Sequence, residues 1–314
     1  MLPREFHILW RSSAPLTAVA VLMAVGLAGA AAGLIFDTRL ITGVPAWEKP
    51  AKFAASTALY SATVAWLFRY LTVWPRFVTW MGRLLALGLT VEVVIIFIQA
   101  ARGTTSHFNV GTPLDLALFR TMGAFIALLW LSSVGITVAF FRQTFSDPAW
   151  GWSVRLGMMI TVIGAAMGGI MLRMTPEQAV QAGSEQPAAT NGAHTVGAPD
   201  GGPGLPLVGW STEHGDLRIP HSFGLHGVQA IPFFAWLISR RRWQQRRQSG
   251  AVFVLASSYV AFIGILAWQA LRGQSIVVPD PLTDSVFLIW ITATAAALAV
   301  SLFRRGRVFE ASVS

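Results

Sequence analysis

Eight apolar runs, each long enough to cross a bilayer, are separated by polar segments along this chain of 314 residues. A spanning helix takes about 20 residues, and lipid offers the backbone no hydrogen-bond partner, so each run is predicted to be α-helical. The predicted helices cover residues 15–36, 53–74, 84–100, 113–141, 155–173, 221–239, 251–271 and 284–303. We therefore expect an all-α, polytopic membrane helix bundle that forms a single membrane domain over residues 1–314.

The first run shares features with a signal peptide, because Arg4 and Arg11 precede it and small residues occupy positions 28–32. Its apolar stretch is longer than the apolar region of a signal peptide, so we expect a retained helix.

Basic residues predict the orientation of the bundle. With the N-terminus inside, fifteen of the 23 Lys and Arg residues fall on the inner side. They are Arg4, Arg11, Arg69, Arg76, Arg83, Arg142, Arg155, Arg240, Arg241, Arg242, Arg246, Arg247, Arg304, Arg305 and Arg307. Because cytoplasmic loops are enriched in such residues, both termini are predicted to be cytoplasmic, in the cytoplasmic (inner) membrane of a bacterium.

The longest segment between the runs, residues 174–220, is predicted to be an outer-side loop. It opens with Thr175-Pro176-Glu177-Gln178, a capping box that predicts a short helix. Residues 183–206 are rich in Gly, Pro and Ala and are predicted to be flexible. A similar capping signal, Thr112-Pro113-Leu114-Asp115, begins the fourth helix.

Composition supports the bilayer as the main partner. The chain is 54% hydrophobic and only 12% charged, whereas soluble domains average about 25% charged. The net charge of +9 sits in short clusters between apolar runs, which argues against nucleic-acid binding. No feature indicates a protein partner, and the lack of cysteine excludes disulfides, thiolate metal sites and Cys nucleophiles.

Ionisable residues near lipid are costly and usually functional. Five of the six histidines and both lysines fall on the predicted outer side, where positive charge is normally rare. The candidate site residues there are Lys49, Lys52, Arg102, His107, Asn109, Asp115, Arg120, Asp216, Arg218, His221, His226 and Gln229. Simpler interpretations stay open, since Asp115 also caps a helix and the two lysines could reach lipid headgroups.

The first functional hypothesis is a redox-cofactor site. His107 paired with His226 or His221 would ligate haem b. The haem propionates would then meet the neighbouring arginines, Arg102, Arg120 and Arg218.

A divalent metal is the other form of this hypothesis. Its ligands would be drawn from His107, His221, His226, Asp115 and Asp216. His221 and His226 are five residues apart, about 140° around a regular helix, so they could not both ligate one ion from such a helix.

The second hypothesis is a metal-free enzyme acting on a lipid-linked or quinone-like substrate at the outer leaflet. Arg and Lys side chains would bind an anionic headgroup, and His107 or His221 would act as general base.

The third hypothesis is a proton-coupled transporter that uses Glu92. This residue lies in the middle of the third apolar run and shares a helix face with Gln99 and Arg102, at spacings of seven and three. The stripe leads towards His107 and could form a proton path. Alternatively, Glu92 is protonated and hydrogen-bonded to a neighbouring helix.

Four motifs support a resemblance that covers nearly the whole chain. They are Trp47-Glu48-Lys49-Pro50 with Lys52-Phe53, Ser106-His107-Phe108-Asn109, Thr112-Pro113-Leu114-Asp115, and Gly215-Asp216-Leu217-Arg218 with Pro220-His221 and Leu225-His226. Together they resemble an uncharacterised group of bacterial multi-pass integral membrane proteins. The resemblance implies a membrane fold and brings no activity with it.

Overall fold

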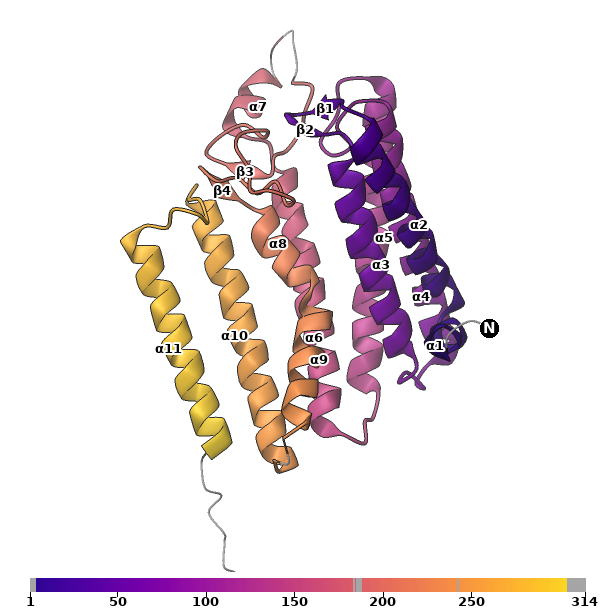
Figure 1. Cartoon of the computed structure of the whole chain (residues 1–314), viewed down its shortest axis with the longest axis vertical. Helices are drawn as coiled ribbons and strands as arrows, with labels where there is room; N and C mark the ends of the chain where they lie inside the picture. The colour runs from indigo at the N-terminus through magenta and orange to yellow at the C-terminus, as the bar shows by residue number, and fades with distance from the viewer. Residues whose placement is uncertain (1–3, 183, 185–187, 242, 304–314) are drawn as a thin grey trace, which may run out of the picture.

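The computed structural model describes residues 4–182, 184, 188–241 and 243–303. Figure 1 shows long helices running roughly side by side, with loops and two short strand pairs gathered at one end. The helices are α1 (Arg4–Ser12), α2 (Ala14–Phe36), α3 (Glu48–Phe68), α4 (Pro75–Ala101), α5 (Pro113–Arg142), α6 (Pro148–Met167), η1 (Gly168–Leu172), α7 (Pro176–Gln181), α8 (Arg218–Leu225), α9 (Gly227–Ser239), α10 (Gln245–Leu271) and α11 (Pro281–Phe303). The strands are β1 (Leu40–Ile41), β2 (Val44–Pro45), β3 (Thr195–Val196) and β4 (Gly215–Asp216), paired as β1–β2 and β3–β4, both antiparallel.

The prediction of an all-α membrane bundle is confirmed. Six helices in the described part of the chain are long and apolar enough to cross a membrane: α2, α4, α5, α6 with η1, α10 and α11. The other two predicted runs also form helices, but α3 carries charged residues in its first turns and α9 has only 13 residues. The chain is therefore a multi-pass membrane protein with at least these six candidate spans.

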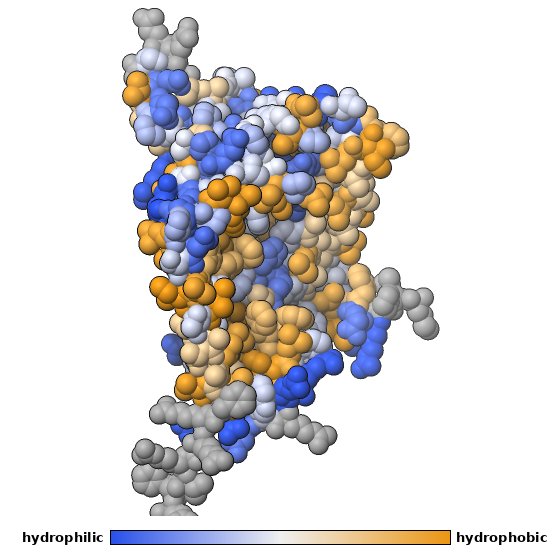
Figure 2. Space-filling view, turned by 60° about the vertical axis from the view of Figure 1, so that its left-hand side comes forward, coloured by the Kyte–Doolittle hydropathy of each residue, from blue (hydrophilic) through white to orange (hydrophobic). Residues whose placement is uncertain are grey.

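Hydropathy divides the surface into a belt and two polar ends. In Figure 2, hydrophobic residues dominate the middle of the molecule and hydrophilic residues gather above and below them. We call the end that carries the loops and strands the capped end. The opposite end exposes Arg69, Arg142, Arg240 and Arg246, and we call it the basic end.

Four helices begin at least five residues earlier than their apolar pattern predicted: α3, α4, α6 and α10. α3 starts at Glu48 rather than at residue 53, so the residues expected in the first outer loop form the first turns of a helix instead. Pro50 fits there because the first backbone N–H groups of a helix have no partner within the helix. α4 starts at Pro75, a residue well suited to the first helical position, rather than at residue 84.

The sixth apolar run is not one continuous helix. α8 ends at Leu225 and α9 begins at Gly227, with His226 between them. The separation of about 140° predicted for His221 and His226 therefore does not apply, because it assumed a regular helix.

Glycines let α6 cross this interrupted helix at very short range. A Cβ atom added to Gly164 would lie 2.4 Å from Cα of Gly224, and one added to Gly227 would lie 2.5 Å from Cγ2 of Ile160. Small residues at such crossings allow backbones to pack closely in membranes. The crossing fixes α8, and with it the position of His221, against α6.

Both predicted capping signals are confirmed. Oγ1 of Thr112 accepts a hydrogen bond from the backbone N–H of Asp115 at 3.1 Å, which begins α5. Thr175 and Gln178 form the reciprocal capping box of α7.

The first and last residues that the structure describes lie away from the capped end. In Figure 1, α1 lies towards the basic end and α11 finishes there. Four of the arginines used to predict the orientation, Arg242, Arg304, Arg305 and Arg307, lie outside the described residues. Residues 183 and 185–187 of the predicted flexible segment also lie outside them.

Candidate functional site

The loop of residues 102–112 carries His107, and polar side chains hold this loop in place. Nδ2 of Asn109 donates to Oγ1 of Thr104 at 2.9 Å and to the carbonyl of Thr105 at 3.1 Å. Phe108 adopts a left-handed backbone conformation with φ of +63°, which is strained for a residue with a side chain. Its carbonyl accepts a hydrogen bond from the N–H of Asn191 at 2.8 Å, so the long outer loop holds this strained turn.

Arg102 and Asp115 form an ion pair that closes the ends of the same loop. Nη1 of Arg102 lies 2.6 Å from Oδ1 of Asp115, and the same oxygen accepts from Nε2 of Gln99 at 2.9 Å. The other carboxylate oxygen accepts from Oγ1 of Thr112 at 2.6 Å. Asp115 and Arg102 are thus occupied in holding the loop to the tops of α4 and α5.

Asp216 and Arg218 form a second such pair at the start of α8. Asp216 is 1% exposed and accepts from the backbone N–H groups of Ser211 and Arg218 at 2.8 and 2.9 Å. Nη2 of Arg218 lies 2.6 Å from Oδ2 of Asp216 and also donates to the carbonyl of Gly209 at 2.6 Å. Both charges therefore fix the segment that leads into α8.

Lys52 joins this second pair to α3. Its Nζ lies 2.7 Å from Oε1 of Glu48 and donates to the carbonyl of Val208 at 3.1 Å. Lys52 and Arg218 thus donate to two successive carbonyls, those of Val208 and Gly209. These bonds attach the loop around residues 208–209 to the first turns of α3 and α8.

Glu92, His107 and Lys49 form a cluster at the capped end, in which Glu92 is buried and the other two are half-buried. Glu92 is 6% exposed, and Nε2 of His107 lies 3.2 Å from its Oε1. Neither carboxylate oxygen has a well-aligned hydrogen bond among the described residues. Lys49 interacts electrostatically with Glu92, and its Nζ lies 5.9 Å from the centroid of the Phe53 ring.

The surroundings of His107 favour its neutral form. Burial and the nearby Lys49 ammonium lower the pKa of His107 below its ordinary value, although Glu92 acts in the opposite direction. The Phe53 ring packs on the imidazole with a centroid distance of 5.8 Å, and Oγ of Ser106 lies 3.1 Å from Nδ1. If Nε2 carries the proton towards Glu92, Nδ1 is the accepting nitrogen and receives the hydrogen bond of the Ser106 hydroxyl.

His221 approaches the same region from α8. Its Nδ1 lies 2.7 Å from the carbonyl of Gly164, an acceptor, so Nδ1 carries the proton and Nε2 keeps its lone pair. His221 also interacts electrostatically with His107, which places the two imidazoles in one neighbourhood.

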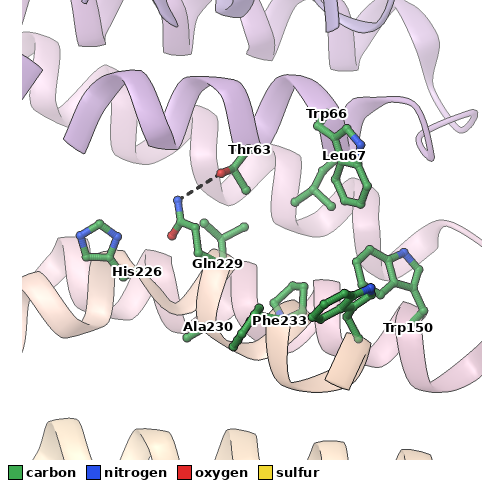
Figure 3. Close-up of a pocket in the computed structure, with 11 residues that line it drawn as sticks. Thr63, Trp66, Leu67, Trp150, His226, Gln229, Ala230 and Phe233 are labelled. Carbon is green, nitrogen blue, oxygen red and sulfur yellow. Dashed lines mark hydrogen bonds between the residues drawn. The ribbon is translucent and has the colours of Figure 1, made fainter. Parts of the chain in front are cut away.

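His226 and Gln229 belong to a different place. They line a groove together with residues of α3, α6 and α9, and Thr63 on the opposite wall lies ten residues beyond Phe53 on α3. Ten helical residues span about 15 Å, so the groove lies well below the cluster around His107. Figure 3 shows His226 and Gln229 at one end of the groove and Trp66, Trp150 and Phe233 towards the other.

The predicted metal set is not brought together. Within the described ranges, no group of three or more His, Asp or Glu side chains could hold a metal ion. Asp115 and Asp216 are used in ion pairs, His221 is held by Gly164, and His226 lies in the groove. Shared ligation of haem b by His107 and His226 stays a prediction, which their different depths in the bundle do not favour.

Two further placements complete the predicted residues. Arg120 is exposed on α5, where its long side chain can extend to the membrane surface. Ser106, Phe53, Thr63 and Trp150 are contacts that sequence reasoning missed. Ser106 and Phe53 had visible signals, because they stand in the motifs that contain His107 and Lys49.

The fold and this cluster define the class of protein: a multi-pass α-helical membrane protein in which a buried carboxylate contacts a half-buried imidazole at the capped end. Comparisons with protein-family models, with curated proteins and with solved structures found no match to this chain.

Proposed function

We propose that this chain is a metal-free membrane enzyme that performs acid–base chemistry on a lipid-linked substrate with an anionic headgroup. The observation that carries the proposal is the contact of 3.2 Å between the buried Glu92 and the half-buried His107. Ionisable groups inside membrane bundles are costly and mark functional sites.

His107 has the features of a general base. A base must be neutral before it acts, and burial lowers the pKa of His107 so that the imidazole is neutral near pH 7. The carboxylate of Glu92 orients the ring through Nε2 and stabilises the imidazolium that forms when Nδ1 takes a proton. The substrate hydroxyl or water would be activated at Nδ1, after it takes the place of the Ser106 hydroxyl there.

Lys49 is the cation that fits the headgroup. Lys52 and Arg218 lie near it, but their charges are already paired with Glu48 and Asp216. Lys49 makes no ion pair of its own among the described residues. The Glu92 carboxylate attracts its ammonium but is already in contact with His107. An anionic headgroup would supply the partner that Lys49 lacks.

Turnover of defined lipids by the purified chain tests this function. The protein would be reconstituted in nanodiscs with EDTA and supplied with short-chain phosphatidic acid and with a polyprenyl diphosphate, and headgroup release measured. We expect His107→Gln and Glu92→Gln to lower kcat by at least about 100-fold, the usual contribution of a positioned base. His214→Gln is the control, since His214 lies at the capped end without an ion pair among the described residues.

Lys49→Met should instead act mainly through KM at alkaline pH, where the base stays neutral although loss of the ammonium raises the pKa of His107. Full activity of His107→Gln, or loss of all activity in EDTA, would contradict the metal-free acid–base mechanism.

A proton-coupled transporter is the second candidate, and the break at His226 favours it. Discontinuous membrane helices in transporters lie at substrate and ion sites. Uptake into proteoliposomes driven by a pH gradient and abolished by Glu92→Gln, in protein that turns over no lipid, would favour transport over catalysis.

The membrane arrangement of the proposal has eight crossings. α3 and the interrupted pair α8–α9 would cross in addition to the six apolar helices, and both chain termini would lie on the basic, cytoplasmic side. The membrane would be the bacterial cytoplasmic membrane, with the cap on its outer face.

A further inference from the structure

A groove on the side of the bundle, between α3 and α9, lies apart from the cluster around Glu92 and His107. Its volume is about 580 Å³. The lining residues are Thr63, Trp66, Leu67, Trp150, His226, Val228, Gln229, Ala230, Pro232, Phe233 and Trp236. Phe233 and Trp236 are 53% and 44% exposed, so the groove opens towards the lipid rather than into the bundle.

Aromatic rings make up much of its wall. Trp66 and Trp150 meet edge to face with centroids 5.7 Å apart, and Phe233 stacks on Trp236 at 5.8 Å with planes 28° apart. Faces and edges of this kind suit a flat aromatic ring better than they suit a flexible chain alone.

Two buried polar atoms of the lining residues have no partner among the described residues: Nε1 of Trp150, and Oε1 of Gln229 at the polar end of the groove. Oγ1 of Thr63 donates its proton to the carbonyl of Leu59 at 2.7 Å, so it can only accept from Gln229. The hydrogen bond of 3.4 Å between Gln229 and Thr63, drawn in Figure 3, must therefore come from Nε2 of the amide. This fixes the amide orientation and leaves Oε1 of Gln229 buried with no hydrogen-bond donor among the described residues.

A buried acceptor without a donor is rare in folded proteins and points to a missing O–H or N–H group. His226 stands one turn before Gln229 along the chain, and its imidazole nitrogens provide a second polar contact at the same end of the groove. A ligand that matches the groove therefore carries a hydroxylated ring at the polar end and an apolar body along the rest.

We propose that this groove binds a hydroquinone with an apolar tail, entering sideways from the bilayer. One ring hydroxyl donates to Oε1 of Gln229, the other contacts His226, and the ring and tail lie along Phe233, Trp236 and Trp66. The proposal concerns binding only and is independent of the acid–base site, which none of these residues touches.

Three probes that differ only in their ring oxygens test the proposal. A decyl-tailed hydroquinone, its oxidised quinone and its dimethyl ether would be titrated anaerobically into the protein in nanodiscs, with tryptophan fluorescence as the readout. We expect the hydroquinone to bind at least tenfold more tightly than the other two, because only it can donate to Gln229.

Gln229→Leu should lower hydroquinone affinity about tenfold and leave the ether unchanged. Thr63→Val is the second variant, because it frees the amide to turn and present Nε2. In that variant the preference for hydroquinone over quinone should fall to near one. Thr90→Val on α4 removes a hydroxyl bonded in the same way to its own helix and is the matched control.

Equal binding of all three probes, unaffected by Gln229→Leu, would overturn the proposal and show that the groove holds lipid chains. Failure of this test would not affect the result of the turnover assay on Glu92 and His107. Failure of the turnover assay would likewise not affect the binding result.

Discussion

At the scale of single residues, His194 shows how the cap depends on one side chain. Its Nδ1 lies 2.7 Å from Oδ2 of Asp200, and its carbonyl accepts from the N–H of Leu217 at 3.0 Å. Burial lowers the pKa of His194 from 6.5 to about 4, in spite of the bond to Asp200. The folded protein therefore holds this imidazole neutral.

A lowered histidine pKa makes the fold sensitive to acid. The contribution of the neutral His194 to the free energy of unfolding is complete above pH 6.5. It is lost as the pH falls from there towards 4, because the unfolded chain takes up the proton first. We expect a loss on the order of 1–3 kcal/mol across this range, seen as a fall in Tm between pH 7 and pH 4.5. His194→Gln should flatten that fall, whereas an equal slope in the variant and the native chain would refute this role.

Residue types alone could not separate ligands from structural partners. Asp115 and Asp216 have the chemistry of metal ligands, and the sequence placed them near histidines, but each proves to be satisfied by an arginine and by backbone or side-chain donors. Glu92 and His107 could be singled out because a glutamate in an apolar run is unusual. Their contact at 3.2 Å depends on how the loop folds back over α4, which no helical periodicity encodes.

At the scale of elements, the apolar pattern located all eight helical runs and misplaced some of their ends. Lipid enforces helices on any long apolar stretch, so the existence of each was predictable. The polar first turns of α3 and the break at His226 were not, because both arise from contacts made by other elements. The break in particular follows from the close crossing of α6 with Gly224 and Gly227.

That crossing predicts a sharp contrast between two glycine variants. In Gly164→Ala the new Cβ would meet the backbone of Gly224, so we expect destabilisation of about 1–3 kcal/mol and displacement of α8. Gly264→Ala on α10 meets nothing within 4 Å and should be neutral or slightly stabilising, since alanine favours helices. Thermal unfolding in one detergent measures both, and equal Tm values for the two variants would disprove a tight crossing.

At the scale of the whole molecule, the number of membrane crossings decides which face carries the site. Six helices are apolar enough to cross on their own, and α3 and α8–α9 are the two whose crossing is proposed. If either failed to cross, the helices after it would run in the opposite sense. The basic end and the capped end would then no longer lie on opposite sides of the bilayer.

The absence of cysteine makes this directly measurable, because each introduced thiol is the only one in the chain. Val44→Cys and Arg76→Cys flank α3, and Glu213→Cys and Gln244→Cys flank α8–α9, all at exposed positions. In intact spheroplasts an impermeant maleimide should label the cysteines at positions 44 and 213 only. Those at 76 and 244 should react only after permeabilisation, and the unaltered chain should never react. Equal accessibility of 44 and 76 would show that α3 does not cross, and equal accessibility of 213 and 244 would show the same for α8–α9. Because the two cysteines of a pair are compared with each other, each pair tests its own helix whatever the orientation of the rest.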